Sequence, residues 1–382
     1  MKIVSIIGTR PEAIKMAPVL RALSQVKGIE SIVCVTGQHR FMLEQVLKLF
    51  EIQADHDLGV MVEGQTLNGL SARILERIDP VLEHVRPQRV LVHGDTSTAM
   101  AAALAAFHRR IPVGHVEAGL RTGSLAEPWP EEMNRRVVDV VGDLLFAPTV
   151  QARDNLLAER LEGRIHVTGN TVIDALQVVA AKLDRHAALR EHIDAQLPQG
   201  APGARMVLVT SHRRENFGQG LQNICEALLS IAARPDVEVV YPVHLNPQVR
   251  EPVERMLGGV PRIHLTAPQD YLGFVRLMQR ASVVLTDSGG VQEEAPALGK
   301  PVLVMREVTE RPEAVRAGTV RLVGTQVQAI ASQVNALLDD PAQYQRMARS
   351  VNPYGDGRAS ERIVAALCGR PVEPFVAQAG AD

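Results

Sequence analysis

The sequence predicts an α/β protein made of two doubly wound, parallel-sheet domains. Short apolar runs alternate with segments of helical periodicity along the chain, which is typical of βαβ units with helices on both faces of a sheet. A chain of 382 residues is longer than one small core organises, so two domains are expected. Polar residues and glycines follow many of the apolar runs, at the strand ends where such sheets bind ligands.

Short apolar runs in two series are the predicted strands. The first series is Ile3–Ile7, Ser31–Val35, Val90–His93, Val113–Val116, Leu144–Ala147 and Ile165–Val167. The second series is Met206–Thr210, Val237–Tyr241, Ile263–Thr266, Val283–Thr286 and Pro301–Val304. Because helical stretches separate most of these runs, the strands are expected to be parallel.

The domain boundaries are predicted from turn and linker composition. We expect an N-terminal domain over residues 1–170, a second domain over residues 171–355, and a C-terminal helix and tail over residues 356–382. The segment Pro198–Gly203 has the composition of a plain linker. Ala359–Leu367 is predicted to be the final helix, and the Ala-, Gly- and Pro-rich residues after Cys368 are expected to be frayed.

Composition and missing motifs exclude several classes of function. A net charge of −2 and an aromatic content of 3% argue against nucleic-acid binding. The three cysteines form no zinc spacing and are expected to be reduced thiols of a cytoplasmic protein. No apolar run spans a bilayer, and the N-terminus is expected to be a strand rather than a signal peptide. Without GxGxxG after a strand, Walker A, HExxH or GxSxG, we expect no cofactor and no metal.

The turn Asp287–Gly290 is the strongest functional signal in the chain. It lies between an apolar run and a predicted helix, an arrangement that aims main-chain N–H groups at an anion. Gly289 and Gly290 let a phosphate approach without a Cβ in the way. Glu293 and Glu294 follow one turn into the helix, where a carboxylate can hold a ribose diol. The turn indicates a nucleotide diphosphate, with an ordinary tight βα turn as the alternative.

Charged residues follow three predicted strands of the first half. Arg10 and Lys15 follow the first strand and can reach a phosphate at a helix N-terminus. Asp95 follows the third strand, although it can equally be the N-cap of the next helix. Glu117 follows the fourth strand, and Arg121 is a candidate partner, because a buried carboxylate needs one.

Glu131 lies where a stiff loop enters a helix, beside Trp129 between two prolines, and can be a first-turn dipole residue and nothing more. In the second half, His212 stands beside two arginines, so its cationic form is expected to be disfavoured until a phosphate arrives.

Four further residues of the second half lie near βα junctions. His244, Gln269 and Phe274 occupy two of them, and Phe274 is either a platform for a base or a core residue. Arg311 offers one more cation directed at a phosphate.

Together these blocks resemble the bacterial UDP-N-acetylglucosamine 2-epimerases of the non-hydrolysing type. The resemblance is carried by Gly8–Pro18, His93–Thr96, Gly114–Gly123, Pro130–Glu132, Thr168–Asp174, His212–Asn216 and Thr286–Pro296, and it continues to Asn352–Gly357. It implies a GT-B fold with the active site in the interdomain cleft and a C-terminal helix that crosses back to the first domain. It also implies a homodimer, no cofactor, and interconversion of UDP-GlcNAc and UDP-ManNAc in cell-surface polysaccharide biosynthesis.

The resemblance implies a role for each site residue. Asp95, Glu117 and Glu131 are the acid–base candidates of an elimination that releases UDP and forms a 2-acetamidoglucal, and the sequence leaves open which carboxylate is the base in which direction. Arg10, Lys15, His212 and the N–H groups of Ser288, Gly289 and Gly290 would stabilise departing UDP, Gln269 and Phe274 would meet uracil, Glu294 the ribose, and Arg311 a phosphate. Gln38, His39 and His244 match parts of the family's allosteric UDP-GlcNAc site, although Phe41 stands where relatives often carry a polar residue.

Two other enzymes and one non-catalytic protein remain as alternatives. A hydrolysing epimerase would release free N-acetylmannosamine, and a GT-B UDP-sugar glycosyltransferase would use the same nucleotide site. A sugar-nucleotide sensor would bind the ligand without turning it over.

Overall fold

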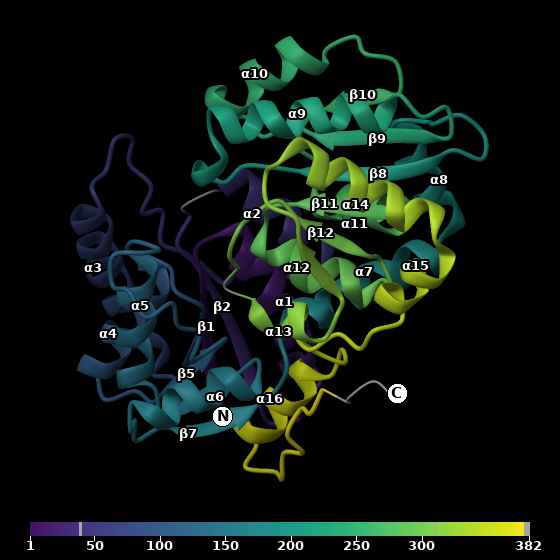
Figure 1. Cartoon of the computed structure of the whole chain (residues 1–382). Helices are drawn as coiled ribbons and strands as arrows, with labels where there is room; N and C mark the ends of the chain where they lie inside the picture. Colours follow the sequence, from purple (N-terminus) through teal and green to yellow (C-terminus); the bar gives the residue numbers. More distant parts are fainter. Residues whose placement is uncertain (38–39, 310, 378–382) are drawn as a thin grey trace. The chain divides into compact units, whose positions relative to one another are not determined.

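The computed structural model describes residues 1–37, 40–309 and 311–377, which form two compact units (Figure 1). The first unit comprises Met1–Ala175 and Tyr354–Val376, and the second contains Leu176–Pro353. The division falls inside helix α7 (Thr171–Arg185), whose first residues Val172 and Ile173 are buried. The segment Pro198–Gly203 therefore lies within the second unit and does not link two domains.

The first unit is built on a seven-stranded parallel sheet. Its strands are β1 (Lys2–Ile7), β2 (Glu30–Val35), β3 (His56–Asp57), β4 (Arg89–His93), β5 (Val113–Val116), β6 (Leu144–Ala147) and β7 (Arg164–Val167). Their order is β3-β2-β1-β4-β5-β6-β7, so the direction of winding reverses between β1 and β4. Ligands of doubly wound sheets bind at the carboxyl ends of the strands beside such a reversal.

Helices cover both faces of this sheet. They are α1 (Arg10–Ser24), α2 (Arg40–Leu49), α3 (Leu67–Val85), α4 (Ser97–His108), α5 (Glu131–Val141), α6 (Val150–Ala158) and α16 (Ala359–Leu367). In Figure 1, α3, α4 and α5 lie side by side along one face, while α1 and α16 pack together on the other. A reciprocal capping box between Thr9 and Glu12 begins α1 directly after β1, which fixes the turn that follows this strand.

The second unit repeats the same winding on a six-stranded parallel sheet. Its strands are β8 (Arg205–Thr210), β9 (Val237–Pro242), β10 (Ile263–Thr266), β11 (Val283–Thr286), β12 (Val302–Val304) and β13 (Val320–Leu322). Its other elements are α8 (Ala187–Gln196), the 3-10 turn η1 (Arg214–Asn216), α9 (Gln219–Ala232), α10 (Pro247–Leu257), α11 (Tyr271–Arg280), α12 (Gly289–Ala297), α13 (Pro312–Arg316), α14 (Val327–Asp339) and α15 (Pro341–Ala348). The order β10-β9-β8-β11-β12-β13 reverses between β8 and β11.

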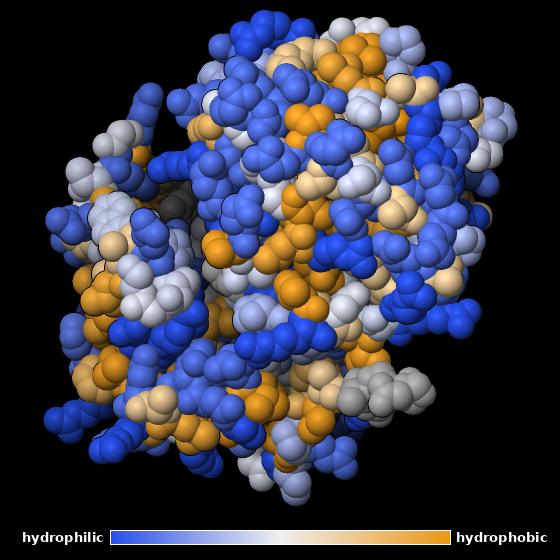
Figure 2. All heavy atoms as spheres, in the orientation of Figure 1, coloured by the Kyte–Doolittle hydropathy of each residue, from blue (hydrophilic) through white to orange (hydrophobic). Residues whose placement is uncertain are grey.

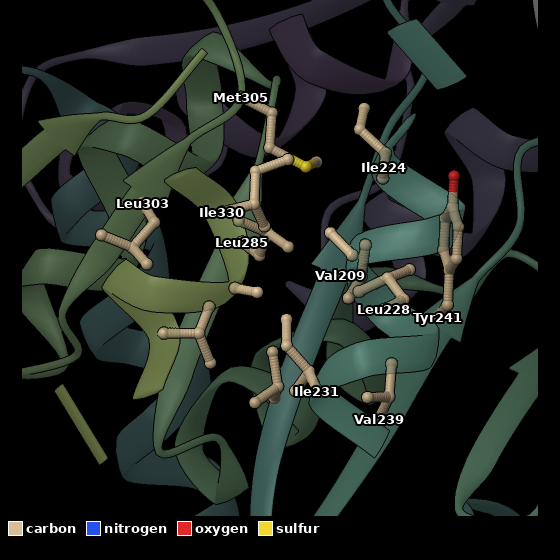
Figure 3. Close-up of a cluster of buried hydrophobic side chains, with 14 of the residues drawn as sticks. Val209, Ile224, Leu228, Ile231, Val239, Tyr241, Leu285, Leu303, Met305 and Ile330 are labelled. Carbon is tan, nitrogen blue, oxygen red and sulfur yellow. The ribbon is translucent and has the colours of Figure 1, made fainter. Parts of the chain in front are cut away.

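The core of the second unit shows why its central strands β8 and β11 are apolar over most of their length. Figure 3 shows Val209 and Leu285 of the central strands beside Leu228 and Ile231 of α9 and Ile330 of α14. All five side chains are fully or almost fully buried. Burying such a side chain stabilises the fold by roughly 2 kcal/mol, which holds the strand ends in fixed places.

The predicted fold class is confirmed: the chain is an α/β protein with two parallel-sheet domains. Every predicted strand is present, with ends that differ from the prediction by no more than one residue. Two strands were missed, β3 and β13, because two or three residues give no detectable periodicity. Helix α12 begins at Gly289, two residues before the predicted helix, because main-chain geometry and not apolar spacing sets its start.

The expectation that residues after Cys368 are frayed is wrong for the described part of the tail. Phe375 is buried, and its main-chain N–H donates to the carbonyl of Val167 at 2.8 Å. The guanidinium carbon of Arg362 lies 5.7 Å from the centre of the Phe375 ring. Phe375 therefore anchors a segment that its composition predicted to be frayed.

The visible surface of both units is mostly hydrophilic, with apolar side chains interspersed (Figure 2). Within the described ranges, no helix combines the length and the apolar character that crossing a bilayer requires.

Candidate functional site

Glu117 directly follows β5, and both its main chain and its side chain are held in place. Its main chain has a φ of +70°, in the left-handed region that residues with a Cβ avoid. The carboxylate Oε2 accepts hydrogen bonds from Nζ of Lys15 and from Nδ2 of Asn170, the latter at 2.8 Å. The Glu117 side chain is 9% exposed. The fold thus fixes one buried carboxylate at the carboxyl end of the sheet.

The predicted ion pair between Glu117 and Arg121 is wrong. Arg121 pairs with Asp139 at 2.8 Å and with Glu159 at 2.7 Å. The Arg121 guanidinium therefore pairs with acids of α5 and of the end of α6, and Lys15 of α1 is the cation that pairs with Glu117. Lys15, which the resemblance assigns to the leaving UDP, thus also lies against an acid–base candidate.

A second buried network holds the turn after β4. His115 and Asp139 have no exposed side-chain surface, and Nδ1 of His115 lies 2.6 Å from Oδ1 of Asp139. Nε2 of His115 lies 2.8 Å from the carbonyl of Gly94, which can only accept, so this ring nitrogen donates. The main chain just before Asp95 is therefore anchored to the neighbouring strand.

Asp95 is not the N-cap of α4. Thr96 is the N-cap, and its hydroxyl accepts from the N–H of Ala99 at 3.0 Å. The Asp95 carboxylate pairs with Arg135 of α5, and its main-chain carbonyl accepts from Nδ2 of Asn134 at 2.9 Å. Helix capping therefore does not explain an acidic residue at this strand end.

Two adjacent glutamates at the start of α5 have different roles. Glu132 is fully buried and accepts from the N–H of Thr122 at 3.1 Å, with ion pairs to Arg135 and Arg136. Glu131 is half-buried, and its carboxylate has no ion pair with any residue that the structure describes. Glu132 therefore stabilises the fold, and Glu131 remains the acid–base candidate of the two. Trp129, two residues earlier, is 69% exposed.

Glu12 is a buried acid that the sequence analysis did not single out. Its Oε2 accepts from the N–H groups of Gly8 at 3.0 Å and Thr9 at 2.6 Å, and its Oε1 accepts from the hydroxyl of Thr96 at 2.7 Å. It thus joins the turns after β1 and β4. Burial raises the pKa of Glu12 to about 7, against the hydrogen bonds from Thr96, Thr9 and Gly8. The capping-box spacing Thr9-x-x-Glu12 was the signal for it.

In the second unit, Asp287 organises the loop that follows β8. It is fully buried and accepts hydrogen bonds from the hydroxyl of Ser211 at 2.9 Å and from Nδ2 of Asn216 at 3.0 Å. The main-chain N–H groups of His212 and Arg213 also donate to it at 3.0 Å. Sequence reasoning gave Asp287 no role, because only the folded loop brings these donors around it.

His212 lies between Asp287 and His244. Its Nδ1 is 3.4 Å from Oδ1 of Asp287, and its ring stacks on that of His244 at 5.8 Å between centroids. The pKa of His212 is lowered mainly by burial and further by Arg213 and His244, whereas Asp287 opposes the shift. The predicted disfavouring of the cation is confirmed in direction, but burial and not the neighbouring arginines is its main cause.

The N-terminus of α12 has the features of an anion site. The Ser288 N–H donates to the hydroxyl of Thr286 at 2.9 Å, so it is already used within the turn. Gly289 and Gly290 begin the helix, where main-chain N–H groups have no intrahelical acceptor. A Cβ on Gly289 would lie 3.3 Å from the guanidinium carbon of Arg311 and 3.5 Å from Nη2 of Arg213. Two guanidinium groups therefore flank this helix end, and Arg213 is an addition to the predicted residues.

The remaining predicted residues of the second unit surround α12 and α11. Glu294 is buried and accepts from the Tyr271 hydroxyl at 2.8 Å, and Glu293 accepts from Nε of Arg311 at 2.8 Å. Nε2 of Gln269 donates to the carbonyl of Ala267 at 2.8 Å, just before α11. Phe274 is half-buried on α11.

Two predicted positions cannot be compared with the structure, because Gln38 and His39 lie outside the described residues. Arg10 is the first residue of α1, at the helix end that faces an anion in the predicted scheme. Across the described ranges, no group of three or more His, Cys, Asp or Glu side chains is placed to hold a metal ion.

The fold is of GT-B type, with acidic side chains at strand ends of one unit and a helix N-terminus flanked by two guanidinium groups in the other. The sequence profile of the UDP-N-acetylglucosamine 2-epimerase family matches residues 21–368. The UDP-N-acetylglucosamine 2-epimerase of Escherichia coli K12 is 56% identical over 369 residues, which cover 96% of this chain and 98% of the relative.

Solved structures agree with the sequence comparison. The UDP-GlcNAc 2-epimerase from Neisseria meningitidis bound to UDP-GlcNAc is 50% identical, with a TM-score of 0.91 over 97% of this chain and 100% of that one. The Methanocaldococcus jannaschii UDP-GlcNAc 2-epimerase in complex with UDP-GlcNAc and UDP is 33% identical, with a TM-score of 0.80 over 97% and 100%. The chain belongs to the UDP-N-acetylglucosamine 2-epimerase family.

We predict that Glu12→Gln changes how stability depends on pH. Between pH 4.5 and about 7 the folded protein keeps a proton on Glu12 while the unfolded chain has lost it, so the stability of the wild type falls as pH rises. Glu12→Gln lacks this loss of unfolding free energy, which amounts to roughly 3 kcal/mol between pH 4.5 and about 7. Urea unfolding at a series of pH values measures it, and parallel pH profiles for the two proteins would contradict it.

Proposed function

We propose that this chain interconverts UDP-GlcNAc and UDP-ManNAc without hydrolysing them, by eliminating UDP and adding it back. The observation that supports this most is the combination of a carboxylate held at a strand end in the first unit with a cationic helix N-terminus in the second. Acid–base work at a sugar and departure of a diphosphate need these two kinds of group.

The chemistry explains why elimination suits such residues. The hydrogen on C2 is not beside a carbonyl, so simple removal of this proton is very difficult. If a carboxylate takes the C2 proton while UDP leaves from C1, the C–H electron pair becomes the C1=C2 bond of a 2-acetamidoglucal. Proton delivery to the other face of C2 and return of UDP to C1 then give the epimer.

In the first unit, Asp95, Glu117 and Glu131 are the proposed acid–base residues. Their placement after β4, after β5 and at the start of α5 gives three carboxylates associated with neighbouring parts of one sheet. Arg10 and Lys15 are proposed to stabilise the leaving diphosphate, with Lys15 also holding Glu117.

In the second unit, the proposed binding groups centre on α12. Gly289, Gly290 and Arg311 would hold the diphosphate, with Arg213 as an additional cation and His212 as a donor to the departing oxygen. Ser288 would contribute its side chain, because its N–H is engaged. Glu294 is proposed for the ribose, and Gln269 and Phe274 for uracil.

Three further proposals rest on the resemblance alone. We propose a homodimer, a cytoplasmic location, and a part in making precursors of cell-surface polysaccharides. His244, with Gln38 and His39, is proposed for an allosteric UDP-GlcNAc site, and its stacking on His212 would connect such a site to the diphosphate residues.

We predict that UDP-GlcNAc incubated with the protein in deuterium oxide yields UDP-ManNAc, with deuterium at C2 of both the product and the recovered substrate. Proton removal and return at C2 is the reason for this label. Proton NMR follows the C2 signals and the products together. Free N-acetylmannosamine would identify a hydrolysing epimerase, transfer only to an added acceptor would identify a glycosyltransferase, and binding without exchange would identify a sensor.

We also predict that Asp95→Asn, Glu117→Gln and Glu131→Gln each lower turnover by about a hundredfold or more, because acid–base groups contribute on that order. Calorimetry should show UDP binding retained, since none of the three carboxylates is proposed to hold the diphosphate. Asp154→Asn is the matched control, an exposed carboxylate on α6 that pairs with the neighbouring Arg153. Normal turnover in any of the three variants removes that residue from the mechanism.

A further inference from the structure

His93 is a buried histidine whose ring has an unsatisfied nitrogen. It is the last residue of β4 and is 3% exposed. Its Nε2 has no hydrogen-bond partner among the residues that the structure describes. Most buried polar atoms are paired, because a buried donor or acceptor without a partner destabilises the fold. This atom therefore calls for an explanation beyond packing.

The carboxylate of Glu117 lies close to this nitrogen. Its Oε2 lies 3.9 Å from Nε2 of His93, which is too far for a hydrogen bond. The same Oε2 already accepts from Lys15 and Asn170. An ionised carboxylate has no proton to offer to the ring, so the two groups face each other without bonding in this state.

The surroundings keep the His93 ring neutral. The titratable groups that face it are Glu117 after β5, Lys15 on α1 and His115 on β5. The pKa of His93 is lowered to about 3, chiefly by burial and also by Lys15 and His115, while Glu117 and the main chain of His93 oppose the shift. A neutral imidazole has one donor nitrogen and one acceptor nitrogen, and the ring can accept a proton that a neighbour offers.

We propose that His93 is a positioning residue, which accepts a hydrogen bond from Glu117 when that carboxylate has taken the C2 proton of the substrate. The proposal rests on the proposed function and selects Glu117 among the three carboxylates. The C2–H electron pair becomes the C1=C2 bond, UDP leaves with the electrons of the C1–O bond, and the proton passes to the Glu117 carboxyl.

Holding the proton on Glu117 requires only a small movement of its carboxyl group. The proton goes to Oε2, the oxygen that lies 3.9 Å from Nε2 of His93, and the carboxyl turns so that this O–H meets Nε2 while Lys15 and Asn170 donate to Oε1. Closing the distance of 3.9 Å to that of a normal hydrogen bond takes about 1 Å. The proton then stays on Glu117 in a defined direction until it is returned, and His93 gains the partner it lacks in the resting state.

The pH dependence of kcat/KM tests this role. A lone pair that faces the carboxyl group stabilises its protonated form, so His93→Phe should move the acidic limb to lower pH by about half a unit or more. It should also lower kcat by about tenfold or more, with the Kd for UDP within about twofold of wild type. His93→Gln keeps an acceptor oxygen near the position of Nε2. The acidic limb of its kcat/KM profile should stay within about 0.2 pH units of wild type.

His166→Phe is the matched control, because His166 lies in β7 of the same sheet, where its ring stacks on that of Phe146. If His93→Phe does not fold, judged by thermal melting, His93→Asn takes its place, since its amide is too short to reach Glu117. A slower variant with an unmoved acidic limb would overturn the proposal, as would a shift of equal size in His93→Gln or His166→Phe. If the wild type itself exchanges no hydrogen at C2, the proposed function fails and not merely the role of His93.

Discussion

Buried carboxylates at the ends of parallel strands are the constraint on which the rest of this structure depends. An ionised carboxylate removed from water destabilises a protein by several kcal/mol unless donors surround it. Glu117 meets this requirement with Lys15 and Asn170, and Asp287 meets it with the loop after β8. Each solution pulls residues from distant parts of the chain to one strand end, so the need to satisfy a charge also assembles the site.

The two units meet this constraint with different results. In the first unit, the main chain of Glu117 is strained, with a φ of +70°, and its carboxylate contacts Lys15. These two constraints keep the carboxylate in one orientation. In the second unit, Asp287 takes up several donors of its loop, and the guanidinium groups of Arg213 and Arg311 are left beside Gly289. One unit therefore fixes a carboxylate at a strand end, and the other places two guanidinium groups beside a helix N-terminus.

The sequence predicted the sheets well because buried parallel strands are short apolar runs with distinct ends. It also placed Asp95 and Glu117 correctly just after strand ends, since these positions follow from the runs themselves. Which side chains pair with one another in the folded chain was not predictable in the same way. Glu117 pairs with a residue 102 positions away and not with Arg121, and the anchoring of Phe375 on β7 depends on a contact far apart in sequence. Such pairings depend on the distances between side chains in the folded chain, which periodicity does not contain.

A crystal structure of this chain soaked with UDP tests the account most directly. The account predicts the diphosphate within hydrogen-bond distance of the main-chain N–H of Gly289 or Gly290, with a guanidinium group of Arg213 or Arg311 as a second contact. UDP bound anywhere else on the chain, with this helix end unoccupied, would contradict it.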